Sequence, residues 1–211
     1  MNKYKCVIFD CDGVLVDSEP IGNQILVDLA NDLGAGIDLN FAMKHFKGSH
    51  FKECVAIISK LVKQPIPDTF ETEYRRRSLE EFGKSLKPID GVTQVIEQLK
   101  LPYCVASSGP ENKMRLNLEV TGLLPYFDGN IFSCYTIQKW KPDPSIFLLA
   151  AKTMGFEPNE CVVIEDSLLG VQGAINGGFD VFGFTAHDYN NEIQDLATQT
   201  FGNMEQLLKM L

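Results

Sequence analysis

Short apolar runs recur along the second half of the chain, each followed by a segment with helical periodicity, and a similar run opens the chain. Such runs are typical of buried parallel strands, because both faces of these strands are covered. The predicted strands are Val7–Phe9, Tyr103–Ser107, Asn130–Cys134, Cys161–Glu165 and Asp180–Phe184. The predicted helices of this part are Gly91–Leu99, Asn112–Val120, Pro144–Met154, Leu168–Asn176 and Met204–Leu211. The alternation predicts βαβ units with right-handed crossovers and a parallel sheet covered on both faces.

Residues 18–84 show helical periodicity and no run of the strand type. We predict four helices there, Pro20–Leu33, Phe41–Phe46, Phe51–Val62 and Asp68–Phe82. Asp68 is the expected N-cap of the last helix and Gly83 its expected stop. The predicted fold class is therefore α/β, with a doubly wound parallel-sheet (Rossmann-like) core of residues 1–17 and 85–211. Residues 18–84 form an inserted small α-helical cap domain.

Composition and charge exclude several classes of protein. The 211 residues carry 19 Lys and Arg against 28 Asp and Glu, a formal charge of −9, so we expect no nucleic-acid partner. No stretch approaches a transmembrane span and no signal peptide opens the chain, so we expect no membrane partner. The six cysteines include no Cys-x-x-Cys pair, which argues against a disulfide framework or a zinc site. We expect a monomer in the reducing cytoplasm.

Chemically active side chains stand at or near the ends of the predicted strands. They are Asp10, Asp12, Ser107, Lys141, Glu165 and Asp166. Taken singly, each has an ordinary explanation as a turn residue, a helix cap, a solvated loop cation or a charge at a helix N-terminus. Because the carboxyl ends of parallel strands meet at one edge of a sheet, we expect the six to form one cluster there. Two carboxylates aimed at one small space repel each other unless a cation holds them, and such oxygen ligands suit Mg²⁺.

The segment Phe9–Glu19, which reads Phe-Asp-Cys-Asp-Gly-Val-Leu-Val-Asp-Ser-Glu, resembles the first motif of the haloacid dehalogenase superfamily of phosphohydrolases. Within that superfamily it is similar to the branch of β-phosphoglucomutase and the small sugar-phosphate phosphatases. The order Asp-x-Asp, Ser, Lys-Pro, Glu-Asp matches the four motifs of the superfamily across nearly the whole chain apart from the cap. The segments Val105–Met114 and Tyr135–Pro144 also look like those of the bacterial 6-phosphogluconate phosphatases.

The resemblance implies a phosphatase that hydrolyses a small phosphorylated sugar or sugar acid, with 6-phosphogluconate as one candidate. It implies that Asp10 is the nucleophile and forms an aspartyl phosphate, an acyl phosphate that water cleaves more easily than a phosphate ester. Asp12 is expected to protonate the leaving oxygen and then to deprotonate the attacking water. Ser107 and Lys141 are expected to bind the non-bridging phosphate oxygens.

The same resemblance implies Mg²⁺ as the cofactor. The expected ligands are Asp10, Asp166 and the backbone carbonyl of Asp12, with Glu165 assisting directly or through water. The metal would shield the charge between an anionic nucleophile and an anionic phosphate.

Two alternatives stay open. A mutase of the β-phosphoglucomutase type carries a histidine in the first cap helix and an arginine after the Lys-Gly stretch. This chain has Gly22 and Phe51 there, which favours hydrolysis. A non-catalytic phosphate-binding module would have lost the nucleophile, the acid or the lysine, and all are present.

The cap is expected to determine specificity. Its cations Lys47, His50 and Arg75–Arg77 could contact a substrate carboxylate, although the arginine run is more typical of a solvated helix face.

Overall fold

The computed structural model describes residues 3–46, 51–188 and 191–211 of the chain. The chain divides into two compact units. One, the core unit, comprises residues 1–17 and 87–211, and the other, the cap unit, comprises residues 18–86. Among the described residues, no helix is both long enough and apolar enough to cross a bilayer.

The core unit is built on a six-stranded sheet in the order β3-β2-β1-β4-β5-β6, and all of its neighbouring strands are parallel. The strands are β1 (Cys6–Phe9), β2 (Tyr103–Ser107), β3 (Ile131–Ser133), β4 (Cys161–Glu165), β5 (Asp180–Phe184) and β6 (Gln199–Phe201). The predicted α/β fold with a doubly wound parallel sheet is confirmed. The chain winds outward from β1 to β2 and β3, and then from β4 to β6 on the other side. β1 therefore lies where the direction of winding changes, which is where open α/β sheets bind ligands.

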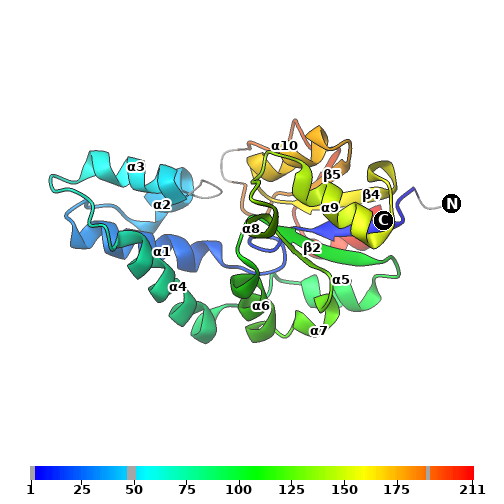
Figure 1. Cartoon of the computed structure of the whole chain (residues 1–211), viewed down its shortest axis with the longest axis horizontal. Coiled ribbons are helices and arrows are strands. Elements are labelled where there is room, and N and C mark those ends of the chain that lie inside the picture. The colour runs from blue at the N-terminus through cyan, green and yellow to red at the C-terminus, as the bar shows by residue number, and fades with distance from the viewer. Residues whose placement is uncertain (1–2, 47–50, 189–190) are drawn as a thin grey trace. The chain divides into compact units, whose positions relative to one another are not determined.

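Helices cover both faces of this sheet (Figure 1). On one face lie α9 (Ser145–Met154) and α10 (Leu168–Asn176), packed on alternate residues of the central strands, among them Ile8, Cys104 and Val163. On the other lie α5 (Val92–Gln98), α6 (Glu111–Val120) and α7 (Leu124–Phe127), where the rings of Phe9 and Phe127 make an edge-to-face contact with centroids 6.1 Å apart. The shorter helices are α8 (Cys134–Ile137), α11 (Leu207–Met210) and the 3₁₀ turns Pro158–Glu160 and Met204–Gln206. The two-sided burial explains why β1 and β4 have no polar alternation.

The cap unit consists of α1 (Glu19–Asp32), α2 (Leu39–His45), α3 (Phe51–Leu61) and α4 (Phe70–Ser85). Their apolar faces form a separate core around Ala30, Ile58 and Phe70. The predicted ends of the last helix are wrong: α4 begins after Thr69, without an Asp68 cap, and continues through Gly83. A Cβ atom at Gly83 would meet no atom within 4 Å, so this position is open. A glycine inside a helix costs only about 1 kcal/mol, which the burial of the preceding Phe82 offsets.

Candidate active site

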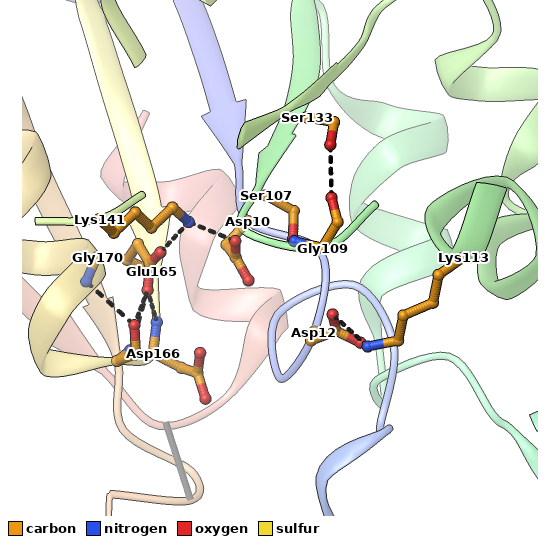
Figure 2. Close-up of polar contacts among 11 residues, drawn as sticks. Asp10, Asp12, Ser107, Gly109, Lys113, Ser133, Lys141, Glu165, Asp166 and Gly170 are labelled. Atoms are coloured by element: carbon orange, nitrogen blue, oxygen red, sulfur yellow. Dashed lines mark hydrogen bonds and ion pairs between the residues drawn. The ribbon is translucent and has the colours of Figure 1, made fainter. Parts of the chain in front are cut away.

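The six predicted site residues come together in the core unit, where β1, β2 and β4 end (Figure 2). Asp10 follows β1, and its backbone N–H donates to Ile164 of β4 at 2.9 Å, so the strand pairing continues up to the catalytic candidate. Ser107 is the last residue of β2, and Glu165 is the last residue of β4. The arrangement follows from the parallel sheet, because all of these strands present their carboxyl ends at one edge.

Lys141 lies at the centre of the buried part of this cluster. Its Nζ donates to Oδ1 of Asp10 at 2.5 Å and to Oε1 of Glu165 at 2.5 Å, and its residue is only 8% exposed. Burial opposes the charged form of Lys141, but the charges of Asp10 and Glu165 outweigh burial and raise the pKa of the lysine. Lys141 is therefore a fixed cation at neutral pH, held between two carboxylates.

Glu165 is fully buried and accepts hydrogen bonds at both oxygens. Oε1 accepts from Lys141, and Oε2 accepts from the backbone N–H groups of Asp166 and Ser167, both at 3.0 Å, and from the Ser167 hydroxyl at 2.9 Å. A Cβ atom on Gly170 of α10 would lie 1.9 Å from Oε1, so only glycine lets this helix approach the carboxylate. These contacts join Lys141 to the end of β4. That Glu165 assists a metal, directly or through water, stays a prediction.

Asp10 and Asp166 are each 7% exposed. Burial raises the pKa of Asp10, as do the charges of Glu165 and Asp166, while Lys141 opposes the rise. The carboxylate of Asp166 lies directly against Gly13, where a Cβ atom would come within 2.3 Å of Oδ2. Gly13 also has a φ of +81°, so the turn after β1 depends on glycine for two reasons. This turn holds the segment 10–13 beside Asp166.

Asp12 points away from Lys141 and toward α6 (Figure 2). Lys113 Nζ donates to its Oδ2 at 2.9 Å, and Nδ2 of Asn117 lies 3.4 Å from its Oδ1. Neither partner was predicted from the sequence, because Lys113 and Asn117 have only the ordinary i, i+4 spacing of polar residues on one helix face. Their place on the helix that follows the predicted strand ending at Ser107 is the one signal that could have pointed to them.

The loop after β2 is held by two serines. The hydroxyl oxygen of Ser107, a residue only 2% exposed, accepts from the backbone N–H of Gly109 at 3.1 Å. The hydroxyl of Ser133, at the end of β3, donates to the carbonyl of Gly109 at 2.7 Å. Ser107 thus makes the turn contact expected of a serine at this place, and it also faces the cluster in Figure 2. Ser133 was missed, although its place near the end of the predicted strand Asn130–Cys134 was a signal that could have pointed to it.

Comparison with known proteins decides the family. A model of the haloacid dehalogenase-like hydrolases matches residues 4–178. The chain belongs to this family. It is 36% identical over 208 residues to the 6-phosphogluconate phosphatase of Escherichia coli K12, covering 98% of this chain and 94% of that protein. It is 30% identical over 196 residues to the phosphorylated carbohydrates phosphatase of Thermotoga maritima, covering 89% of this chain and 88% of that one.

A solved structure supports the same assignment. The haloacid dehalogenase-like protein ATU0790 of Agrobacterium tumefaciens C58 superposes with a TM-score of 0.91 at 30% identity, over 98% of this chain and 97% of that chain. The family match and the relatives named as phosphatases place the hydrolase among the phosphatases.

The carboxylates of the hydrolase suit Mg²⁺, which is bound partly by water, better than a metal that is held by protein side chains alone. Within residues 3–46, 51–188 and 191–211, no three side chains of His, Cys, Asp or Glu stand ready to hold a metal together. Mg²⁺ requires less, because it is commonly bound through one or two carboxylates and keeps several waters. Asp10 and Asp166 supply two buried carboxylates that influence each other electrostatically. Lys141 is the one cation in contact with Asp10 and Glu165 among the described residues, so negative charge is in excess and favours a bound cation.

Of the cap cations that we predicted to contact a substrate, the described ones pair with carboxylates of the cap itself. On α4 the arginines Arg75 and Arg76 pair with glutamates of the same helix, and Arg77 pairs with one as well, in agreement with a solvated helix face. Lys47 and His50 lie outside the described residues, so their predicted contact with a substrate stays a prediction.

Proposed function

We propose that this hydrolase is a Mg²⁺-dependent phosphatase that cleaves a small phosphorylated sugar or sugar acid through an aspartyl phosphate on Asp10. The observation that carries the proposal is the position of Asp10, buried at the end of the central strand in contact with the fixed cation Lys141. A carboxylate held there is shielded from water and partly neutralised, as a nucleophile that meets an anionic phosphate must be.

In the first step of the proposed reaction, an oxygen of Asp10 attacks phosphorus and the bond from phosphorus to the sugar oxygen breaks. Asp12 gives its proton to that departing oxygen. In the second step Asp12 takes a proton from water, the water oxygen attacks phosphorus, and the bond to Asp10 breaks to release inorganic phosphate. Lys141 and Ser107 would bind the non-bridging oxygens in both steps.

Asp10 and Asp166 would hold Mg²⁺, together with the backbone carbonyl of Asp12 and water. When bound, the ion supplies positive charge that offsets the repulsion between the nucleophile and the phosphate. Because Glu165 is committed to Lys141 and to backbone N–H groups, we assign it an indirect part, through the position of Lys141.

Hydrolysis is favoured over the mutase reaction by two positions of the cap unit. Where mutases carry a histidine, this chain has Gly22, and a Cβ atom there would lie 3.2 Å from the hydroxyl of Tyr74. Where mutases carry an arginine, it has Phe51, whose ring centroid lies 5.0 Å from that of Tyr74. Both positions thus adjoin one aromatic side chain, which offers neither an imidazole nor a guanidinium group to a sugar bisphosphate.

The substrate class follows the relatives. One is named for 6-phosphogluconate and another for phosphorylated carbohydrates. We therefore propose a sugar phosphate or sugar acid phosphate, with 6-phosphogluconate as the first compound to test.

The test is Mg²⁺-dependent phosphate release from a panel of sugar phosphates that includes 6-phosphogluconate. We expect release from at least one of them, and complete loss in Asp10→Asn. The matched control is Asp128→Asn, which removes the same charge from an exposed surface position. Activity that survives in Asp10→Asn would refute the aspartyl-phosphate mechanism. An isomerised sugar phosphate in place of free phosphate, when a bisphosphate is added, would favour the mutase.

A further inference from the structure

The side chain of Asp12 is held from one side by α6. Lys113 and Asn117 are four residues apart, so both face the same way, and each contacts a different oxygen of the Asp12 carboxylate, at 2.9 and 3.4 Å. A carboxyl group gripped at both oxygens has its rotation about χ2 restricted. The direction in which it presents a proton is then determined by the helix.

Asn117 makes a second and independent case for a role at Asp12. It is 0% exposed, a position where a helix of the core would ordinarily carry an apolar residue. Its Nδ2 faces Asp12, whereas its Oδ1 is buried and finds no hydrogen-bond partner among the described residues. An unsatisfied buried acceptor costs about 1–3 kcal/mol. The contact of the Asn117 amide with the Asp12 carboxylate is therefore kept in spite of a cost in stability.

The same helix is joined to the loop that follows β2. Gly109 of this loop lies against the pair, because a Cβ atom there would be 3.7 Å from Oδ2 of Asp12 and 3.9 Å from Cδ of Lys113. Ser133 fixes the carbonyl of Gly109 at 2.7 Å. The carboxyl group of Asp12 and the backbone beside Ser107 are therefore held as one assembly.

We propose that Lys113 and Asn117 are positioning residues that orient the Asp12 carboxyl group for proton transfer to the departing oxygen. The proposal rests on the proposed function, because it gives a task to the general acid of that reaction. Neither residue touches the reacting atoms. Their effect is transmitted through the orientation of Asp12.

The orientation of a general acid matters only for a leaving group that needs a proton. A sugar alkoxide needs one, whereas p-nitrophenolate leaves without it. The value of kcat/KM covers the steps up to release of the alcohol, so it isolates the proton donation from the later attack of water. The experiment therefore compares kcat/KM for 6-phosphogluconate, or the best sugar phosphate of the panel, with that for p-nitrophenyl phosphate.

The variants are Lys113→Met, which keeps the length of the side chain without its charge, and Asn117→Leu, which keeps approximate volume without the amide. We expect each to lower kcat/KM for the sugar phosphate roughly 10- to 100-fold, a part of the 10²- to 10⁴-fold that a general acid contributes. For p-nitrophenyl phosphate we expect a change of less than about threefold. Asp12→Asn shows how far kcat/KM for the sugar phosphate falls when the general acid is absent. Lys113→Arg, which keeps the charge, should retain more of this activity than Lys113→Met.

The control is Arg115→Met on the same helix, whose guanidinium pairs with Glu111 and Asp128 on the exposed face. This variant should leave kcat/KM unchanged for both substrates. A urea unfolding curve for Asn117→Leu separates structure from function: we expect stability equal to or above that of the wild type, together with the loss on the sugar phosphate.

Two outcomes would overturn the proposal. If Lys113→Met lowers kcat/KM equally for the two substrates, Lys113 binds the phosphoryl group and does not orient the acid. If neither variant changes the ratio of the two substrates while Asp12→Asn does, the contacts of α6 are without effect on catalysis. Failure of the proposed function looks different, since wild-type protein would then release no phosphate from either substrate.

Discussion

The contact between Gly170 and Glu165 allows a sharp test of how the site is held together. In Gly170→Ala the new methyl group would fall 1.9 Å from both Oε1 and the carboxyl carbon of Glu165, so the carboxylate must move. That carboxylate accepts from Lys141, from the N–H groups of Asp166 and Ser167, and from the Ser167 hydroxyl. A displaced Glu165 cannot keep all of these contacts.

The magnitude can be worked from these contacts. A hydrogen bond to a charged group contributes about 1.5–3 kcal/mol, and we expect two of the contacts to be lost. Alanine returns about 1 kcal/mol, because it is a better helix residue than glycine. The expected net loss in the free energy of unfolding is therefore about 3 kcal/mol. Phosphatase activity should fall at least about tenfold as well, because Lys141 loses one of its two anchors and its position at Asp10 is no longer fixed.

Gly173→Ala is the matched control, one turn further along the same helix. Its Cβ atom would meet only ordinary contacts, 3.4 Å to the ring of Phe147 and 3.5 Å to the backbone of Pro142. We expect this variant to be as stable as the wild type or more stable by up to about 1 kcal/mol, with full activity. Urea unfolding followed by circular dichroism measures both variants. Equal stability of Gly170→Ala and Gly173→Ala would refute the view that the Glu165 contacts stabilise the core.

Three further predictions concern the turn, the metal and the cap. Gly13→Ala should lose Mg²⁺ binding, because its methyl group would lie 2.3 Å from Oδ2 of Asp166 and the φ of +81° disfavours alanine. Calorimetry measures the binding, and unchanged binding would contradict the role of this turn. A chelator should abolish phosphate release and added Mg²⁺ should restore it, and activity in the presence of chelator would exclude a required metal. Hydrogen bonds from Arg76 and Arg77 lower the pKa of Glu73 from 4.5 to about 2. A lowered pKa adds stability above pH 4.5, and this is lost as the pH falls toward 2. Carbon NMR of the Glu73 carboxyl group should show a midpoint near 2, whereas a midpoint near 4.5 would show that the ion pairs do not form in solution.

The sequence predicted the sheet well because its central strands are buried on both faces. The bounds of β2, β4 and β5 agree with the predicted ones. β6 was missed because only Phe201 of its three residues is buried, so it carries no apolar run. The four-residue helices α7 and α8 were missed because one turn is too short to show a helical period.

The residues that come together in the candidate site could be predicted from the sequence, but most of their side-chain partners could not. Topology alone brings Asp10 and Asp166 to one edge of the sheet, since both follow strands that are neighbours in it. The side-chain partners of these residues come from segments far away in the chain, and no local sequence pattern predicts them. Lys113 is separated from Asp12 by 101 residues, and no spacing rule links the two.

The four carboxylates of the site differ in their side-chain neighbours. Asp10 contacts the fixed ammonium of Lys141, which opposes the rise that burial causes in the pKa of this proposed nucleophile. Glu165 contacts the same ammonium, and backbone N–H groups occupy its other oxygen, in agreement with the indirect part proposed for it. Asp12 is turned toward α6, away from that ammonium, and has Lys113 as its own partner, in keeping with the separate role proposed for it as the general acid. Asp166 lies against the turn after β1, and we propose that it holds the cation together with Asp10. If the proposed roles follow from which donors reach which oxygen, a change at Lys113 should affect Asp12 and leave Asp10 and Glu165 intact, whereas a change at Lys141 should affect both Asp10 and Glu165.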